Sequence, residues 1–240
     1  MKRLLAALVS TAIVFGGMAA TASASAGQLP QDHRIPGGIA IIELGQSSTA
    51  PKVTYLGKPV FVYGHGGANG TAPDWTAVVG LALSAKPGTS SISVDQKKQS
   101  FTIEAHKYEE QRLTVQNKHV NPSEESLKRY RREATEMGKV FTSFTTAQSQ
   151  GWPDMIWPAQ GPLSSPFGLR RFFNGEERNP HSGLDIAAPR GSDIIAPADG
   201  VVRATGEYFF NGNTVMLDHG QGLVSMFCHM DRIDAKPGQQ

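Results

Sequence analysis

The sequence has little of three things: cysteine, net charge and long apolar runs. The single cysteine, Cys228, cannot form an internal disulfide, so the fold must rely on its core or on a metal. Lys and Arg number 23 against 21 Asp and Glu, and two of the basic residues are Lys2 and Arg3. The remainder is balanced in charge, which gives no electrostatic case for nucleic acid as a partner.

The apolar run Leu4 to Phe15 follows Lys2 and Arg3 and precedes small residues that end in Ala24-Ser25-Ala26. It is too short to span a bilayer, and this three-part order is typical of a cleaved export signal. We therefore predict a signal peptide over residues 1–26 and an exported protein of the periplasm or cell envelope. After cleavage it would not be an integral membrane protein; an uncleaved membrane anchor is the alternative.

Short β-type runs separated by Gly, Pro, Asn and Asp fill the next part of the chain, which predicts a small antiparallel sandwich over residues 27–120, similar to an immunoglobulin-like module. The runs are Ile39–Leu44, Val53–Leu56, Val60–Tyr63, Trp75–Leu83, Ser91–Val94 and Phe101–Ala105. None of the histidines here has catalytic spacing, so surface or turn positions are expected for His33, His65, His106 and His119.

Residues 121–150 have a different texture, which predicts a helical linker. Ser123 is a candidate N-cap, and Glu124 and Glu125 suit the positive end of a helix. Gly138 can end that helix. Its balanced charges favour a solvated face on a connecting helix.

A second domain is predicted over residues 151–240, mostly β and without another long helix. Trp152 and Trp157 stand at its start, where packing of the rings is the expected role. Strand and turn signals then place strands at Gly200–Ala204, Thr214–Asp218 and Leu223–His229.

Three side chains of this second domain could carry chemistry. His181 and Asp185 stand four residues apart, and Pro180 and Gly183 argue against a helix between them. In an extended strand they would share a face, so a metal site and an ordinary hydrogen-bonded pair are both open. His229 ends a strand whose alternation would place it with Phe227 on one face, at an accessible rim.

The order of several short motifs resolves the choice. Together they resemble the lysostaphin-type (LytM-domain) zinc metallopeptidases, which cut peptidoglycan. The motifs are Phe167-Gly168-Leu169-Arg170, His181-Ser182-Gly183-Leu184-Asp185, Ile195-Ala196-Pro197-Ala198-Asp199-Gly200, Gly212-Asn213-Thr214-Val215, Asp218-His219-Gly220 and Phe227-Cys228-His229-Met230. Less specifically, Tyr108-Glu109-Glu110-Gln111-Arg112-Leu113 and Asn121-Pro122 resemble the amino-terminal module of envelope members.

The resemblance implies that His181 and Asp185 bind one Zn²⁺ and that His229 is a catalytic residue beside it. The substrate would be the peptide stems or cross-links of cell-wall peptidoglycan. The implied architecture is mainly β: a sandwich, a connecting helix and an antiparallel peptidase sheet that is incomplete at the C-terminus. Phe227 stands where the family often has Tyr, so any role of that hydroxyl is absent.

The family completes its site with a His-x-His pair farther along, and the sequence reaches Gln240 without one. One of those histidines is the third zinc ligand, so we expect the chain as printed to bind zinc weakly and to be impaired as an enzyme. Asp231, Asp234 or a histidine of the first domain could substitute. The alternatives are a non-catalytic peptidoglycan-binding or amidase-regulating protein, an envelope module that binds through its sandwich, and a shortened gene product.

Overall fold

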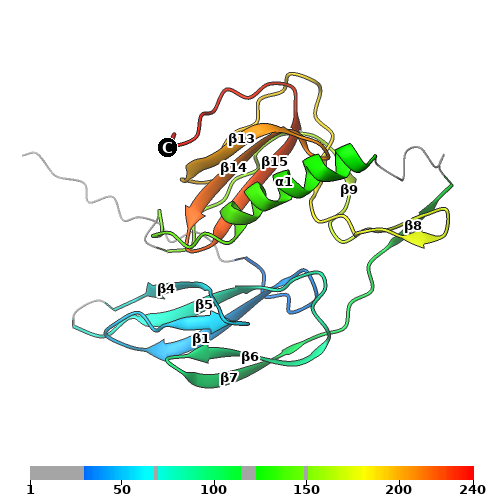
Figure 1. Cartoon of the computed structure of the whole chain (residues 1–240). Helices are drawn as coiled ribbons and strands as arrows, with labels where there is room; N and C mark the ends of the chain where they lie inside the picture. The colour runs from blue at the N-terminus through cyan, green and yellow to red at the C-terminus, as the bar shows by residue number, and fades with distance from the viewer. Residues whose placement is uncertain (1–29, 68–69, 115–122, 149–150) are drawn as a thin grey trace, which may run out of the picture.

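The computed structural model describes residues 30–67, 70–114, 123–148 and 151–240 (Figure 1). The predicted signal peptide, residues 1–26, lies outside these ranges, and so does His119. In the described ranges the fold is mainly β with a single α-helix, as the sequence predicts. Among the described residues, no helix is both long and apolar enough to cross a membrane.

The first half of the chain is a sandwich of two antiparallel sheets, in which the order is β1-β5-β4 in one sheet and β3-β2-β6-β7 in the other. The strands are β1 (Ile39–Gln46), β2 (Val53–Tyr55), β3 (Lys58–Pro59), β4 (Phe61–His65), β5 (Asp74–Gly80), β6 (Gly88–Val94) and β7 (Lys97–Ile103). Alternate apolar side chains of both sheets meet in one buried cluster, which includes Ile42, Val79, Ile92 and Phe101. The predicted sandwich is therefore confirmed.

The second half contains the helix and a curved three-stranded antiparallel sheet, in the order β13-β14-β15. Its elements are α1 (Glu124–Phe141), β9 (Leu163–Ser165), β10 (Arg170–Phe173), β11 (Glu176–Glu177), β12 (Asp185–Ile186), β13 (Val201–Tyr208), β14 (Gly212–Gly220) and β15 (Leu223–Met230). Helix α1 lies across one face of the sheet, where Val140 packs against Ala204 and Met216 (Figure 1). The opposite face holds a second cluster around Val215 and Leu217.

Helix α1 begins as predicted and ends later than predicted. The Ser123 hydroxyl oxygen accepts the backbone N–H of Ser126, 3.2 Å away, which confirms the N-cap. The helix continues through Gly138 to Phe141 and ends at Thr142, so the predicted stop at Gly138 is wrong. Packing of Val140 on the sheet stabilises this last turn and outweighs the weak helix propensity of one glycine. Most charged residues of the helix are exposed, as the predicted solvated face requires, but Glu133 is buried.

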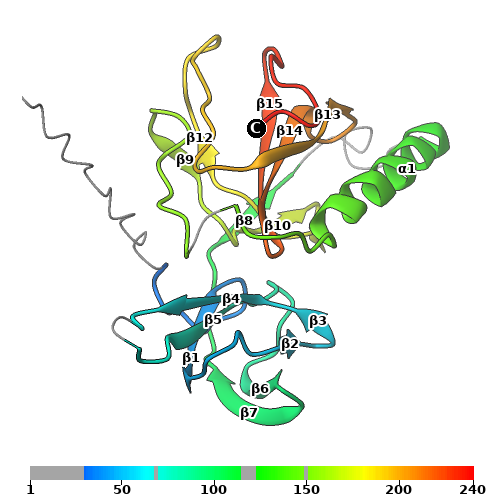
Figure 2. The same cartoon turned by 90° about the vertical axis from the view of Figure 1, so that its left-hand side faces the viewer.

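The two halves of the chain are in contact along the outer face of the β1-β5-β4 sheet (Figure 2). Trp152 and Leu223 of the second half pack there against Phe61 and Val78. The side-chain amide of Gln221 bonds both backbone groups of Val62, accepting from its N–H and donating to its carbonyl, each at 3.0 Å.

A single strand also crosses between the halves. β8 (Glu110–Leu113) pairs in parallel with β10, although the predicted domain boundaries place it with the sandwich. The domain division at 120 and 150 stays a prediction, and β8 belongs by its hydrogen bonds to the second half.

The two tryptophans at the start of the second half behave differently. Trp152 is 8% exposed, whereas Trp157 is 58% exposed, so the packing expected of both rings is confirmed only for Trp152. The segment that carries Trp157 is held by backbone bonds, from Ile156 N–H to Pro197 carbonyl and from Ile195 N–H to Pro158 carbonyl. These bonds fix the backbone while leaving the indole in solvent.

Candidate metal centre

The structure brings His181 and Asp185 together. Nε2 of His181 lies 3.1 Å from Oδ1 of Asp185; the imidazole is mostly covered, at 15% exposure, and the carboxylate is half exposed. The intervening residues form neither a helix nor a continuous strand, because the chain bends at Gly183 and enters β12 only at Asp185. The pair therefore forms across a bend, which the sequence spacing alone left open.

Backbone pairing with the segment around Gly168 holds His181 in place. The Gly168 N–H donates to the His181 carbonyl at 2.7 Å, and the His181 N–H donates to the Leu169 carbonyl at 2.9 Å. Asp185 is held separately, because β12 pairs with β9 and places Asp185 opposite Ser165. Two motifs of the sequence thus meet at the pair, Phe167-Gly168-Leu169 and His181 to Asp185.

The other ring nitrogen of His181 fixes the proton of the imidazole. Nδ1 lies 3.0 Å from the Pro166 carbonyl oxygen and 3.2 Å from the Ser165 hydroxyl. A carbonyl oxygen can only accept, so Nδ1 carries a proton in that bond. Arg171 donates to the same Ser165 hydroxyl at 3.1 Å. Nε2 is therefore the nitrogen that is directed at Asp185.

This arrangement leaves Nε2 as the nitrogen that can bind a cation together with Oδ1 of Asp185. An imidazole with its proton on Nδ1 presents the lone pair of Nε2, which is the form that binds a metal ion. Two ligands at zinc distances from a tetrahedral ion stand about 3.4 Å apart, close to the distance in the pair. A carbonyl that accepts from the second nitrogen is also the usual support of a zinc-bound histidine. The donor set fits zinc as two of its ligands.

His229 lies near the end of β15, where it is exposed. Its backbone N–H donates to the Asn211 carbonyl at 2.8 Å, and no hydrogen bond of the described residues links it to the pair. Its role beside the metal stays a prediction, as do the ligand roles of His181 and Asp185.

A bulge in β15 changes how His229 is presented. Asn213 pairs with Met230 and Val215 with Phe227, so two residues of β15 stand opposite one of β14. His229 lies in this bulge with φ +56°. Phe227 and Met230 consequently pack in the same cluster, so strict alternation does not continue past Phe227.

In the part of the chain that the structure describes, no His, Cys, Asp or Glu completes a group of three around a metal position. The suggested substitutes have other partners: Asp231 pairs with Arg190, and Asp234 with Arg232. These guanidinium groups lower the pKa of both carboxyls, Arg190 for Asp231 and Arg232 for Asp234.

His219 is a structural residue. It is 2% exposed, and its ring nitrogens lie 2.7 Å from the Asp199 carbonyl and 2.8 Å from the Ser225 hydroxyl. Both nitrogens are therefore satisfied within the fold.

The sequence matches two family models, "Peptidase family M23" over residues 179–240 and "Peptidase family M23 N-terminal domain" over residues 32–119. A crystal structure of a Pseudomonas aeruginosa protein assigned to peptidase M23 is similar at 39% identity and a TM-score of 0.67, over 86% of this chain and 78% of that one.

Curated relatives match over a shorter stretch. The DD-carboxypeptidase/endopeptidase Mpg of Neisseria meningitidis is 36% identical over 76 residues. The peptidoglycan DD-endopeptidase ShyA of Vibrio cholerae is 35% identical over 79 residues. Each match covers 32% of this chain and 18% of the relative.

Proposed function

Because this chain belongs to peptidase family M23, we propose that it is an exported zinc metalloendopeptidase that cleaves peptide stems or cross-links of bacterial peptidoglycan. The single observation that carries the proposal is the pair His181 and Asp185, 3.1 Å apart and supported at Nδ1 by the Pro166 carbonyl. The names of the Neisseria and Vibrio relatives support the substrate class.

In this proposal His181 and Asp185 hold one Zn²⁺. When bound, zinc polarises a peptide carbonyl and lowers the pKa of a water ligand to about 7. Asp185 contributes the negative charge and His181 a neutral nitrogen, which Pro166 orients. His229 stabilises the oxyanion that develops on the carbonyl, or orients the attacking water, from its exposed position on β15.

A catalytic zinc takes three protein ligands, and among the described residues no third His, Cys, Asp or Glu joins His181 and Asp185. We propose that the 240-residue chain therefore binds zinc weakly and hydrolyses little. The experiment compares this chain with a version extended beyond Gln240 by a segment carrying a His-x-His pair. Zinc-dependent release of peptides from cross-linked peptidoglycan is expected of the extended version and not of its His181→Ala variant. Hydrolysis that persists in His181→Ala would exclude the proposed centre.

The second candidate is a non-catalytic protein that binds peptidoglycan or regulates an amidase. This function predicts retention on insoluble peptidoglycan that neither a chelator nor His181→Ala changes. Sedimentation of the full chain with peptidoglycan, with and without the chelator, separates the two candidates.

A further inference from the structure

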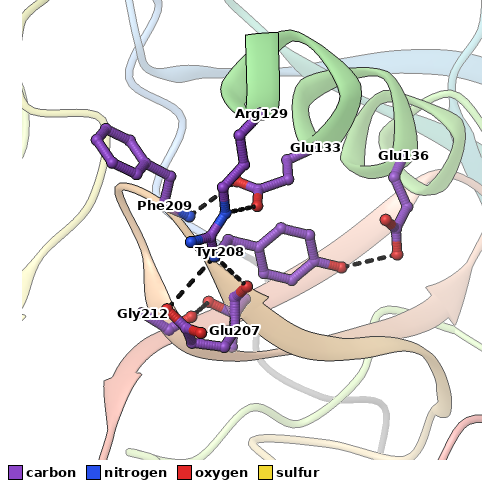
Figure 3. Close-up of polar contacts among 8 residues, drawn as sticks. Arg129, Glu133, Glu136, Glu207, Tyr208, Phe209 and Gly212 are labelled. Atoms are coloured by element: carbon purple, nitrogen blue, oxygen red, sulfur yellow. Dashed lines mark hydrogen bonds and ion pairs between the residues drawn. The ribbon is translucent and has the colours of Figure 1, made fainter. Parts of the chain in front are cut away.

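A polar cluster joins helix α1 to the turn between β13 and β14. Its centre is Glu133, which is 6% exposed. One carboxylate oxygen accepts from Nε of Arg129 at 2.6 Å, and the other accepts the backbone N–H of Phe209 at 2.8 Å (Figure 3). We call Arg129 and Glu133 the brace.

Side chains of α1 also bond the last two residues of β13. Arg129 also donates to the Glu207 carbonyl at 2.9 Å and lies 3.3 Å from the Glu207 carboxylate. One turn farther along the helix, Glu136 accepts from the Tyr208 hydroxyl at 3.0 Å. Three consecutive residues, 207 to 209, are thus each bonded to α1 (Figure 3). Because the central carboxylate is buried, loss of either partner leaves a charge without compensation.

The far end of the same turn holds His229. Its N–H donates to the Asn211 carbonyl at 2.8 Å, and the Asn211 amide donates to the sulfur of Cys228 at 3.3 Å. At Gly212 an added Cβ would lie 3.6 Å from both Cα and Nδ1 of His229, so the turn lies directly against the histidine. One end of the segment 207–211 is bonded to the helix and the other end to His229.

His229 needs such a support because of its backbone conformation. A left-handed φ of +56° is strained for an L-amino acid other than glycine, and it persists only where neighbouring contacts hold it. Bulges beside a functional site typically aim a side chain in a direction that regular alternation does not allow. The direction of the His229 imidazole therefore depends on where Asn211 stands.

We propose that Arg129 and Glu133 are positioning residues for His229. The brace fixes the backbone of residues 207–209 on α1. The short turn that follows then fixes the position of Asn211, whose carbonyl accepts from the His229 N–H and so holds the bulge that carries the imidazole. The connecting helix is then part of the catalytic apparatus and more than a spacer. The functional importance of this coupling rests on the proposed role of His229, whereas the coupling itself does not.

The test is NMR of the full chain without zinc or substrate, which makes its result independent of the proposed function. The Cα, Cβ and imidazole resonances of His229 are compared between the unmodified protein and Glu133→Gln. His219 serves as an internal reference, because its ring contacts Asp199 and Ser225 and none of the residues of the turn. Glu125→Gln is the matched control, since it removes the same charge from an exposed position of α1.

We expect the resonances of His229 and Asn211 to move in Glu133→Gln and to stay in place in Glu125→Gln, with His219 unchanged in both. A second pair, Arg129→Met against the exposed Arg131→Met, keeps the test available if Glu133→Gln does not fold. Unchanged His229 resonances in the brace variants would overturn the proposal. Equal movement of His219 and His229 would also overturn it, because that pattern indicates general loosening of the sheet.

Discussion

The indole of Trp152 meets the ring of Phe61 edge-on, with the two ring centroids 5.2 Å apart and an interplanar angle of 64°. Phe61 begins β4 of the sandwich, and Trp152 belongs to the second half of the chain, after α1. The contact therefore joins the two halves through one apolar cluster, to which Tyr63 and Val78 also belong. The sandwich is a structural support of the second half and not an appended module.

We predict that Trp152→Ala destabilises the protein by about 3–5 kcal/mol, the usual loss when a large aromatic ring leaves a buried cluster. Trp157→Ala is the matched control, because its indole is mostly exposed and should change stability by no more than about 0.5 kcal/mol. Chemical denaturation of both variants measures the difference. Equal losses would mean that the cluster does not join the halves.

The raised pKa of Tyr208 predicts that the folded state loses stability at alkaline pH. Burial is the largest cause that raises the pKa of Tyr208 to about 12, and the neighbouring Glu136 carboxylate adds to it. The folded state therefore holds the phenol proton more tightly than the unfolded chain, whose ordinary value is 10.0. This contribution to stability is fully present below pH 10 and is lost as the pH rises through about 12.

Denaturation midpoints measured from pH 9 to pH 12 should fall more steeply for the unmodified protein than for Tyr208→Phe. The exposed Tyr130→Phe, on the same helix as Glu136, should follow the unmodified protein. A Tyr208→Phe curve that parallels the unmodified one would contradict the assignment.

The lowered pKa of Glu133 predicts that the folded state loses stability at acid pH. Burial by itself raises the pKa of Glu133, but the Phe209 N–H and Arg129 outweigh it and lower the pKa below the ordinary 4.5. The contribution of the brace is thus present above pH 4.5 and is lost as the pH falls through the lowered value. Unfolding measured at pH 7 and pH 3 should show a smaller acid loss in Glu133→Gln, while Glu125→Gln should keep the loss of the unmodified protein.

The sequence predicts well what depends on local pattern. The strands from Ile39 to Ile103 and the N-cap at Ser123 follow from alternation and capping chemistry, and the structure has them. Trp152 and Trp157 have similar local sequence, with a proline after each, and only tertiary packing decides which one is buried. The same limit applies to Gly138, where the packing of Val140 extends the helix.

The candidate site shows where local pattern is insufficient. The spacing of His181 and Asp185 indicates a pair, but the Nδ1 support comes from Pro166, which only the fold brings to the imidazole. The bulge at His229 has no local signal, because its cause is the register between β14 and β15. The burial of Glu133 is likewise invisible in a helix whose charges balance.

The most direct test of the account is a zinc titration of the full chain by calorimetry, compared with His181→Ala, Asp185→Ala and His229→Ala. The account predicts weak one-to-one binding by the unmodified protein, abolished in the first two variants and retained in His229→Ala, because the proposed function gives His229 a catalytic role and no ligand role. Zinc binding that is unaffected by His181→Ala and Asp185→Ala would contradict the central claim that these two side chains share a metal ion.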